Sequence, residues 1–408
     1  LNVYLEREAF KMETECVRSV LQVGEWACSI DLSDAYFHVT MHQTYRKYLR
    51  FTVNGVTYQF KALPMGLSPS GMIFSRTARV IKGFVQQFGI HCHQYLDDWL
   101  IRAQTPELAR AHTQFVLDIA LALGYVVNYQ KSELDPKQEI VFLGYHIHLK
   151  FGMITPTRER WDRIKLRLRP LLNQKSISAR QYQQAVGTLV STEKIVPRGM
   201  IHIRPIQLHL LRNWSQSRDS QAMLITVPEK VKLAARWWLQ EDHIFKGVPF
   251  SQSNPQIHVL TDASLQGWGG VVGTKQIKGT WSTQERLLHI NALELLAILK
   301  TIQAFRRQLS GSHILILTDN ATAVAYLKKQ GGTHSPAMMD NTYKVFQLLE
   351  LLDISFKIRH IPGILNVQAD LLSRPNQIIG TEWTIQPQIL IQLWQMVPRP
   401  QVDLFATN

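Results

Sequence analysis

The feature that most constrains this sequence is a pair of adjacent aspartates, Asp97 and Asp98, between two apolar segments. The run QYLDDWLI predicts a tight hairpin that presents both carboxylates. Neighbouring negative charges repel each other and partial burial penalises both, so such a pair is costly unless it binds cations. A solvated turn is the alternative for two aspartates on their own. The hairpin therefore indicates a metal site if a further carboxylate converges on it.

A third carboxylate, Asp31, stands at the end of an apolar strand predicted within SIDLSDAYFHV. Together with the hairpin it would supply three carboxylates, which can hold two Mg²⁺ ions. Two ions roughly 3.5–4 Å apart can activate a hydroxyl and stabilise the leaving group of an in-line displacement. The three aspartates therefore predict nucleotidyl transfer.

A second set of carboxylates occurs in the last third of the chain. Each member follows or lies within an apolar segment, and the set is Asp262, Glu294, Asp319 and Asp370. Four carboxylates again predict two divalent ions per site, Mg²⁺ or alternatively Mn²⁺. A water activated there could hydrolyse a phosphodiester.

The hydrophobic pattern predicts more than one domain in these 408 residues. Residues 26–60 are strand-rich, with Asn54-Gly55 as a hairpin signal, and two amphipathic helices follow by Gly124. From residue 155 to about 239 the pattern is helical. We expect four prolines to separate the helices of this segment, namely Pro170, Pro197, Pro205 and Pro228. Strands and helices then mix from residue 257.

The charge, the cysteines and the hydropathy of the chain predict its binding partners and its cellular compartment. The formal net charge is +14, and residues 155–250 hold 17 Lys/Arg against 7 Asp/Glu, which predicts a nucleic-acid contact or, alternatively, a solvated basic surface. Cys16, Cys28 and Cys92 lack metal-ligand spacing, so we expect buried thiols in a reducing compartment. No membrane span or signal pattern is found, and we expect an intracellular protein of the cytoplasm or nucleus, neither secreted nor membrane-bound.

The N-terminal motifs, taken in order, resemble the reverse transcriptase family. SIDLSDAYFHV resembles its first metal motif, LPMGLSPSGMIF its template-and-nucleotide helix, and YLDD its signature hairpin. GYVVNYQKSEL and VFLGYHI resemble its lysine-bearing loop and its primer-grip hairpin. The family's cationic residues that clamp the triphosphate align upstream of Leu1, so we expect a fragment with incomplete fingers, whose polymerisation is in question.

This resemblance implies roles for particular residues of the first site. Asp31, Asp97 and Asp98 would bind metal, with the backbone carbonyl of Leu32 as an extra ligand. The implied partners are an RNA template, a DNA primer and deoxynucleoside triphosphates.

Four more residues would contact the nucleotide. Tyr36 would lie beneath the incoming sugar, where its ring would clash with a 2′ hydroxyl and favour deoxynucleotides. Met65 and Gly66 belong to the template-and-nucleotide motif, although retroviral relatives commonly carry glutamine at the position of Met65. Lys131 is the lysine of the loop near the active site.

The second carboxylate set resembles that of ribonuclease H folds, over residues 257–374. The implied activity is cleavage of the RNA strand of an RNA–DNA hybrid. His360 precedes Asp370 by ten residues, as in members where a mobile histidine assists proton movement or product release. Ser264 and Asn320 would touch the RNA strand and read its 2′ hydroxyl groups.

The segment between the two sites would hold the hybrid duplex. Three arginines at helical spacing would bind phosphate while apolar residues pack on another face; they are Arg160, Arg163 and Arg167, against Trp161, Ile164 and Leu168. SARQYQQAVGTLVS resembles the thumb helix of the family, with Gln181, Gln184 and Gly187 free to approach the duplex. The alternative is a connecting helical domain with no ligand.

We therefore predict an α+β multi-domain protein, with a right-hand polymerase palm, a helical thumb and an α/β ribonuclease H-like domain. The predicted parts are partial fingers and palm at 1–152, a basic thumb or connection at 153–246, a linker at 247–256, the ribonuclease H-like domain at 257–376 and a tail at 377–408.

Within the family, several phrases resemble retrotransposons of the DIRS type, which carry a tyrosine recombinase; they are FKMET, YLDDWLI, IPGILNVQADLLSR and PRPQVDLFATN. Elements of the gypsy class with long terminal repeats are the second choice, and in either case we expect other domains of the same polyprotein. Two alternatives to an active enzyme stay open: a degenerate or host-retained nucleic-acid-binding protein, and a structural subunit. The presence of all seven metal carboxylates favours the active enzyme, most strongly for the nuclease.

Overall fold

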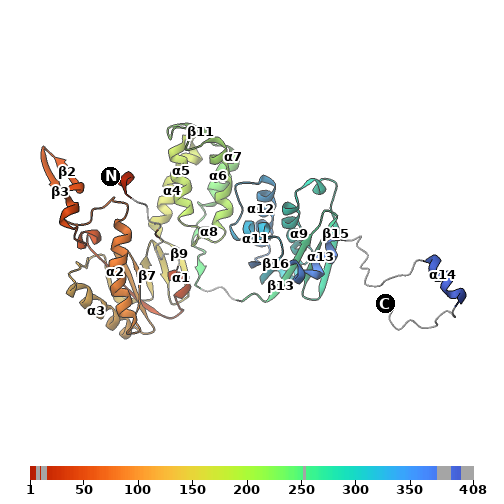
Figure 1. Ribbon diagram of the computed structural model, residues 1–408, viewed down its shortest axis with the longest axis horizontal. Helices are drawn as coiled ribbons and strands as arrows, with labels where there is room; N and C mark the ends of the chain where they lie inside the picture. Colours follow the sequence, from red (N-terminus) through yellow and green to blue (C-terminus); the bar gives the residue numbers. More distant parts are fainter. Residues whose placement is uncertain (6–9, 11–15, 251–253, 375–386, 397–408) are drawn as a thin grey trace. The chain divides into compact units, whose positions relative to one another are not determined.

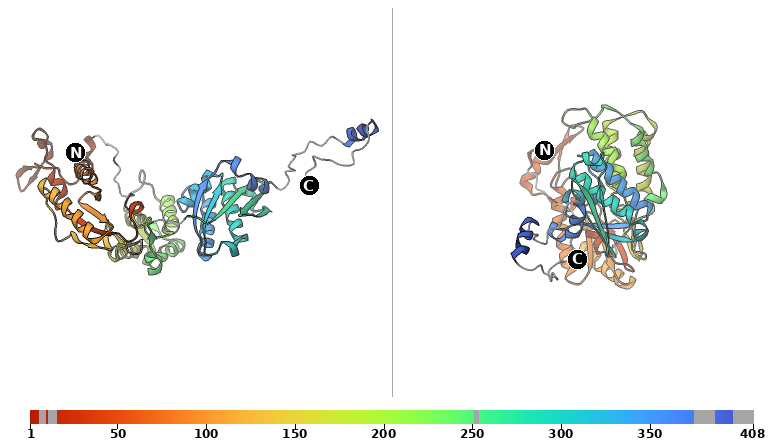
Figure 2. Two further views of the ribbon diagram at one scale, coloured as in Figure 1. Left: turned by 90° about the horizontal axis from the view of Figure 1, so that it is seen from below. Right: turned by 90° about the vertical axis from the view of Figure 1, so that its right-hand side faces the viewer.

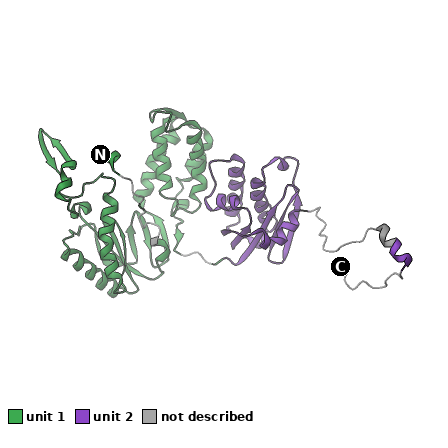
Figure 3. Ribbon diagram, viewed as in Figure 1, with its two compact units in different colours: residues 1–254 green, residues 255–408 purple. Residues whose placement is uncertain are grey.

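The computed structural model describes residues 1–5, 10, 16–250, 254–374 and 387–396. The chain divides into two compact units, Leu1–Asn254 and Pro255–Asn408 (Figure 3). Each unit combines helices with its own β-sheet, which confirms the predicted α+β class. Within the described ranges, no helix has both the length and the hydropathy for a membrane span. FKMET lies almost entirely outside the described residues, as does the predicted tail except for helix α14 (Pro387–Met396).

A four-stranded antiparallel sheet in the order β4-β5-β1-β6 forms the centre of the first unit. Its strands are β1 (Trp26–Asp31), β4 (His91–Tyr95), β5 (Asp98–Ala103) and β6 (Glu133–Lys137). Helices α2 (Ser70–Gln86) and α3 (Pro106–Ala122) contact this sheet (Figure 1). Phe74, Trp99 and Val116 are fully buried in their shared core, which fixes the β4–β5 hairpin against β1.

Local signals explain where α3 begins and ends. The Thr105 hydroxyl accepts a hydrogen bond from the Leu108 amide, and Pro106 occupies the first turn. Gly124 follows the helix at a φ of +82°, a conformation that favours glycine. Cys28 and Cys92 are buried free thiols, as predicted, while the side chain of Cys16 lies outside the described residues.

The Asn54-Gly55 hairpin predicted from the sequence is confirmed. It joins β2 (Arg50–Val53) to β3 (Val56–Gln59), and both turn residues have positive φ, 49° and 77°. The remaining short elements before α2, among the residues that the structure describes, are α1 (Cys16–Val20) and three 3₁₀ helices, η1 (Asn2–Tyr4), η2 (Ala35–His38) and η3 (Gln43–Leu49).

A second antiparallel sheet, in the order β12-β9-β8-β7, follows the first. Its strands are β7 (Glu139–Phe142), β8 (Tyr145–His148), β9 (Met153–Pro156) and β12 (Val248–Pro249). Strand β12 lies within the linker predicted at 247–256, and it pairs with β9. Because Phe250 is buried in the same core, the packed part of this unit extends into this stretch as far as Phe250.

The helical segment contains five helices and a small β-pair. They are α4 (Arg158–Asn173), α5 (Ala179–Val190), α6 (Gly199–Asn213), α7 (Glu229–Trp237), α8 (Glu241–Phe245), β10 (Ser176–Ser178) and β11 (Leu224–Thr226). The expectation that all four prolines separate helices is wrong, because Pro170 lies inside α4 and Pro205 lies inside α6. Burial of apolar side chains such as Ile203 and Ile206 stabilises α6 despite the hydrogen bond that a proline removes.

The second unit is built on a five-stranded sheet in the order β15-β14-β13-β16-β17. Figure 2 shows the strands and helices of this unit in green to blue. Its strands are β13 (Ile257–Ala263), β14 (Gly267–Val272), β15 (Lys275–Thr280), β16 (His313–Thr318) and β17 (Ser355–His360). The first three pair antiparallel, whereas β13, β16 and β17 run parallel.

Helices cover both faces of this sheet. The principal ones are α9 (Ile290–Ala304), α11 (Ala321–Lys328), α12 (Pro336–Leu351) and α13 (Val367–Ser373), with short turns at η4 (Glu285–Leu287), α10 (Arg306–Leu309) and η5 (Gly363–Leu365). A Cβ at Gly270 would lie 2.2 Å from Thr301 of α9, and one at Gly269 would lie 2.5 Å from Ala369 of α13. Adjacent strand residues face opposite ways, so these glycines let α9 and α13 approach opposite faces closely.

Two candidate carboxylate metal sites

The first candidate site lies where the β4–β5 hairpin meets the end of β1. Asp31 is directly opposite Asp98 in the register of β1 and β5. The Leu32 amide donates a 2.8 Å hydrogen bond to the Asp97 carbonyl, which ties the hairpin turn to the end of β1. Leu96 in this turn has a φ of +52°, which is strained for a non-glycine residue. The fold thus brings together three aspartates that the sequence separates.

The negative charges of these aspartates repel one another. The pKa of Asp98 is raised to about 6, chiefly by burial and also by the charges of Asp31 and Asp97, while a hydrogen bond from the Leu143 amide opposes this rise. Burial also raises the pKa of Asp31, with Lys131 opposing that effect. Asp97 is exposed, and within the described ranges these three carboxylates are not gathered within 4.8 Å of one another. A divalent cation would relieve their repulsion.

The backbone of the β7–β8 turn is a functional feature that sequence reasoning missed. Leu143 and Gly144 both have positive φ, 54° and 72°. Besides the bond from Leu143 to Asp98, the Gly144 carbonyl accepts a 3.2 Å hydrogen bond from Arg160 Nη1. The VFLGYHI motif could locate this turn, but a backbone donor leaves no signal of its own in side-chain types.

This contact alters the predicted phosphate-binding face of α4. Arg160 is directed to the turn, and Arg167 Nη1 donates a 2.9 Å hydrogen bond to Gln184 Oε1. Arg163 is exposed, while Ile164 and Leu168 are fully buried as predicted. Trp161 also packs against this core as predicted, and a Cβ at Gly187 would meet open space.

The predicted nucleotide-contacting residues lie around the same hairpin. Tyr36 packs edge-on against Phe74 at 5.9 Å, and burial, Asp97 and Tyr95 raise its pKa. Gly66 has a φ of +82° and Met65 beside it is 61% exposed. Lys131 is exposed and acts electrostatically on Asp31, whereas Leu32 is buried at the end of β1.

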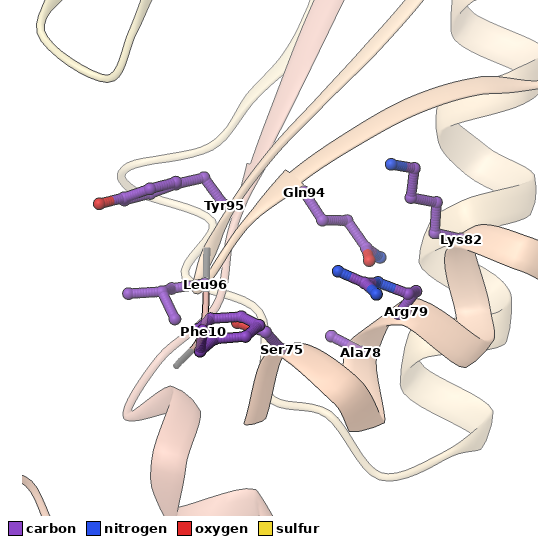
Figure 4. Close-up of a pocket in the computed structure, with 8 residues that line it drawn as sticks. All are labelled: Phe10, Ser75, Ala78, Arg79, Lys82, Gln94, Tyr95 and Leu96. Carbon is purple, nitrogen blue, oxygen red and sulfur yellow. The ribbon is translucent and has the colours of Figure 1, made fainter. Parts of the chain in front are cut away.

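A small pocket lies between α2 and the YLDD hairpin (Figure 4). Its lining includes Arg79 and Lys82 of α2 together with Gln94 and Leu96, and the side chains of Arg79 and Gln94 point toward one another. Sequence reasoning missed these two cations. Their three-residue spacing on a predicted helix would have indicated a shared face.

The second candidate site is more compact. One carboxylate oxygen from each of Asp262 on β13, Glu294 on α9 and Asp319 after β16 lies within 4.8 Å of the others. Asp262 and Glu294 are 5% and 4% exposed, so two negative charges would be nearly desolvated. The pKa of Glu294 is raised to about 9, chiefly by burial, and the charges of Asp262 and Asp319 contribute to this rise. The pKa of Asp262 is raised to about 6, again chiefly by burial.

A divalent ion fits this cluster. Oε2 of Glu294 is buried and has no hydrogen-bond partner in the described part of the chain. Carboxylate oxygens are the ligands that hard divalent cations prefer, and an ion between them would satisfy this orphaned atom. The acidic residues of this unit could therefore bind metal.

Asp370 and His360 border the cluster. Asp370 on α13 raises the pKa of Asp262 but forms an ion pair with Arg374, 2.6 Å away. His360 ends β17, is exposed, and pairs in register with Thr318, the residue before Asp319. A Cβ at Gly363, just after β17, would lie 3.2 Å from Asp319 Oδ2.

The two residues predicted to touch RNA make internal hydrogen bonds. Ser264 Oγ donates to the Ser373 carbonyl at 2.6 Å. Asn320 caps α11 through its side-chain oxygen, and its Nδ2 donates to Asn291 Oδ1 at 3.0 Å. Both residues therefore support the framework around Asp262 and Asp319.

The fold and the two sites define the class. An antiparallel sheet carries a pair of aspartates on a hairpin opposite a third, and a separate mixed sheet carries a buried carboxylate cluster. This is the arrangement of a polymerase palm joined to a ribonuclease H-like nuclease.

Comparison with known families supports that class. Residues 7–147 match the family model described as reverse transcriptase (RNA-dependent DNA polymerase). Residues 252–344 match the RNase H-like domain found in reverse transcriptase. The chain therefore contains a segment that matches reverse transcriptase and a segment that matches a ribonuclease H-like domain, and domains of both kinds typically depend on divalent metal.

Curated relatives include viral polyproteins. The chain is 25% identical over 368 residues to the putative enzymatic polyprotein of Cassava vein mosaic virus, covering 85% of this chain and 52% of the relative. It is 24% identical over 367 residues to the enzymatic polyprotein of Figwort mosaic virus (strain DxS), covering 85% and 50%. The chain thus spans about half the length of these relatives.

Solved structures share the fold. The foamy viral protease-reverse transcriptase dRH in complex with ds DNA aligns at a TM-score of 0.51 and 17% identity, covering 87% of this chain and 60% of that one. The foamy viral protease-reverse transcriptase in complex with dsDNA aligns at 0.50 and 16%, covering 88% and 72%. At these identities the likeness concerns the fold.

Proposed function

We propose that this chain copies an RNA template into DNA from a DNA primer and cleaves the RNA strand of the resulting RNA–DNA hybrid. The observation that carries the proposal is the presence of a separate carboxylate group in each of the two matched domains. Deoxynucleoside triphosphates are the proposed second substrate of the polymerase. The basic excess of residues 155–250 supports contact of this segment with the hybrid.

The proposed cofactor is Mg²⁺, replaceable by Mn²⁺, with two ions per site. The proposed ligands are Asp31, Asp97, Asp98 and the Leu32 carbonyl for the polymerase, and Asp262, Glu294, Asp319 and Asp370 for the nuclease. Bound ions supply Lewis-acid stabilisation of the charge that develops on a phosphate. The raised pKa values of Asp98 and Glu294 support these sites, because such groups ionise more readily when a cation is present.

Several other side chains would act directly on the substrates. Tyr36 would exclude a 2′ hydroxyl from the sugar site, and Lys131 would offer its ammonium to the triphosphate. Met65 and Gly66 would contact the nucleotide or template from the loop before α2. His360 would move a proton at the edge of the nuclease site, and its exposure at the end of β17 supports that role.

The test is cleavage of a labelled RNA–DNA hybrid with Mg²⁺ by the wild type, by Asp319→Asn and by a matched control, Asp340→Asn, which changes an exposed aspartate of α12. The proposal expects cleavage by the wild type and the control, and its loss in Asp319→Asn. Tight hybrid binding without cleavage by the wild type would favour the alternative, a degenerate nucleic-acid-binding protein.

We further propose that the chain serves replication of a DIRS-type retrotransposon as one part of a polyprotein inside the cell, in the cytoplasm or nucleus. The phrases YLDDWLI, IPGILNVQADLLSR and PRPQVDLFATN support this subfamily. A tyrosine recombinase reading frame beside this one in the genome would support it further. Flanking long terminal repeats without a recombinase would favour the gypsy class instead.

A further inference from the structure

A third cluster of metal-type ligands lies on the β7–β8 hairpin, apart from both carboxylate sites. Glu139 is directly opposite His148 in the register of the two strands. His146 precedes His148 by two residues, so the two imidazoles leave the same face of β8. One ligand atom from each of the three residues lies within 4.8 Å of the other two.

The Glu139 carboxylate faces both rings. Its Oε2 lies 3.9 Å from His146 Nε2, and its Oε1 lies 3.7 Å from His148 Nδ1. Two ligands bound to Zn²⁺ at about 2.0–2.1 Å in tetrahedral geometry are about 3.3 Å apart. Small rotations of the side chains would therefore bring these atoms to bonding distance without moving the strands.

A hydroxyl on the neighbouring strand orients one ring. His148 Nε2 lies 3.2 Å from Thr155 Oγ1 of β9, which leaves Nδ1 facing Glu139. Metal-binding histidines usually have such a partner on the ring nitrogen that does not bind the ion.

Ion pairing alone explains this cluster less well. The two imidazole rings lie 4.1 Å apart between centroids, so protonating both would create repulsion that one half-exposed carboxylate only partly offsets. Two imidazoles and one carboxylate suit a transition-metal ion, whereas Mg²⁺ prefers oxygen ligands alone.

We propose that Glu139, His146 and His148 bind a divalent transition-metal ion of the Zn²⁺ type, with solvent completing its coordination. The ion would join β7 to β8 near the Leu143–Gly144 turn that contacts Asp98. This structural site is distinct from the carboxylate sites in both its ligand atoms and its preferred metal.

The experiment is a Co²⁺ titration of the full chain in excess Mg²⁺, which occupies the all-oxygen sites, followed by visible absorption. We expect one Co²⁺ per chain with nitrogen-ligand absorption bands that Zn²⁺ abolishes. His148→Gln and Glu139→Gln should lose these bands, while Thr155→Val should weaken binding about 10- to 100-fold. His258→Gln, which changes an exposed histidine of β13, should leave the bands unchanged.

Absence of the bands in the wild type would overturn the proposal, and so would their full retention in Glu139→Gln. The latter variant keeps the test decisive if a histidine variant fails to fold, because the Glu139 side chain is 58% exposed.

Discussion

Asp370 and Arg374 form an ion pair in which Arg374 Nη2 lies 2.6 Å from Asp370 Oδ1. The fourth acidic residue of the nuclease site is therefore paired with an arginine, whereas carboxylate oxygens of Asp262, Glu294 and Asp319 lie close to one another. Metal binding by Asp370 would therefore compete with Arg374.

Removing this competitor should tighten metal binding. In Arg374→Gln we expect the Mg²⁺ concentration for half-maximal hybrid cleavage to fall by up to about fivefold, because a partly exposed ion pair contributes about 1 kcal/mol at most. A Mg²⁺ titration of cleavage measures it. Arg306→Gln, which changes an arginine of α10, is the control, and a higher Mg²⁺ requirement in Arg374→Gln would contradict the expectation.

The two metal sites should fail independently, because they lie in separate compact units. Asp98→Asn and Asp97→Asn should abolish primer extension and leave hybrid cleavage intact, and Asp319→Asn should do the reverse. Both activities are measured on each preparation, with Asp135→Asn as an exposed control in β6. Equal loss of both activities in any one of these variants would refute independence.

Mg²⁺ should stabilise the nuclease unit more as pH rises. The folded-state pKa of Glu294 is raised to about 9 from its ordinary value of 4.5, so the contribution of this group to stability is full below about pH 4.5 and is lost as the pH rises toward 9. Ionised carboxylates bind Mg²⁺, which offsets this loss.

Thermal unfolding with and without Mg²⁺ between about pH 6 and about pH 9 measures this effect on Tm. Glu294→Gln should remove most of the pH dependence, since it cannot ionise. The same Mg²⁺-induced shift in Tm at both ends of the range would argue against a metal at this cluster.

A buried ion pair should be essential to the first unit. Glu25 is fully buried and accepts a hydrogen bond from Arg102, which is 5% exposed. Arg102→Leu leaves a buried charge without its cation and should cost about 3–5 kcal/mol of unfolding free energy. Urea unfolding measures it.

A matched exposed pair provides the control for this variant. Lys137→Met breaks the Glu133–Lys137 pair and should cost less than about 1 kcal/mol. The double change Glu25→Met with Arg102→Leu should recover much of the lost stability. A cost for Arg102→Leu as small as that of the control would contradict the role of burial.

Tyr36 should discriminate against ribonucleotides. Tyr36→Ala is expected to reduce the preference for deoxynucleotides roughly 10- to 200-fold, the range that one steric contact supplies. Single-nucleotide primer extension with each sugar measures the ratio. Tyr36→Phe retains the ring and should retain the preference, and an unchanged ratio in Tyr36→Ala would exclude the role.

Short-range chemistry explains what could be predicted from the sequence. The Asn54-Gly55 hairpin, the α3 boundaries at Thr105 and Gly124, and the fold class all follow from turn residues, caps and hydrophobic periods within a few positions. The acidic motifs could also be found in the sequence, because adjacent carboxylates in an apolar hairpin are costly unless they bind cations.

Some elements carried no local signal. Strand β6 contains Pro136 and charged residues, and β15 is largely exposed, so neither has the alternating apolar pattern of a strand. Each forms because a neighbouring strand offers its edge, β1 for β6 and β14 for β15.

The sequence by itself determined which side chains could bind metal, since residue types and short motifs specify ligand chemistry. Only the tertiary structure decided which of them meet: Asp31 with Asp98 across β1 and β5, Glu139 with His148 across a hairpin, and Asp370 with Arg374. The reason is that strand register and side-chain pairing depend on how the whole core packs, which no local window of residues contains.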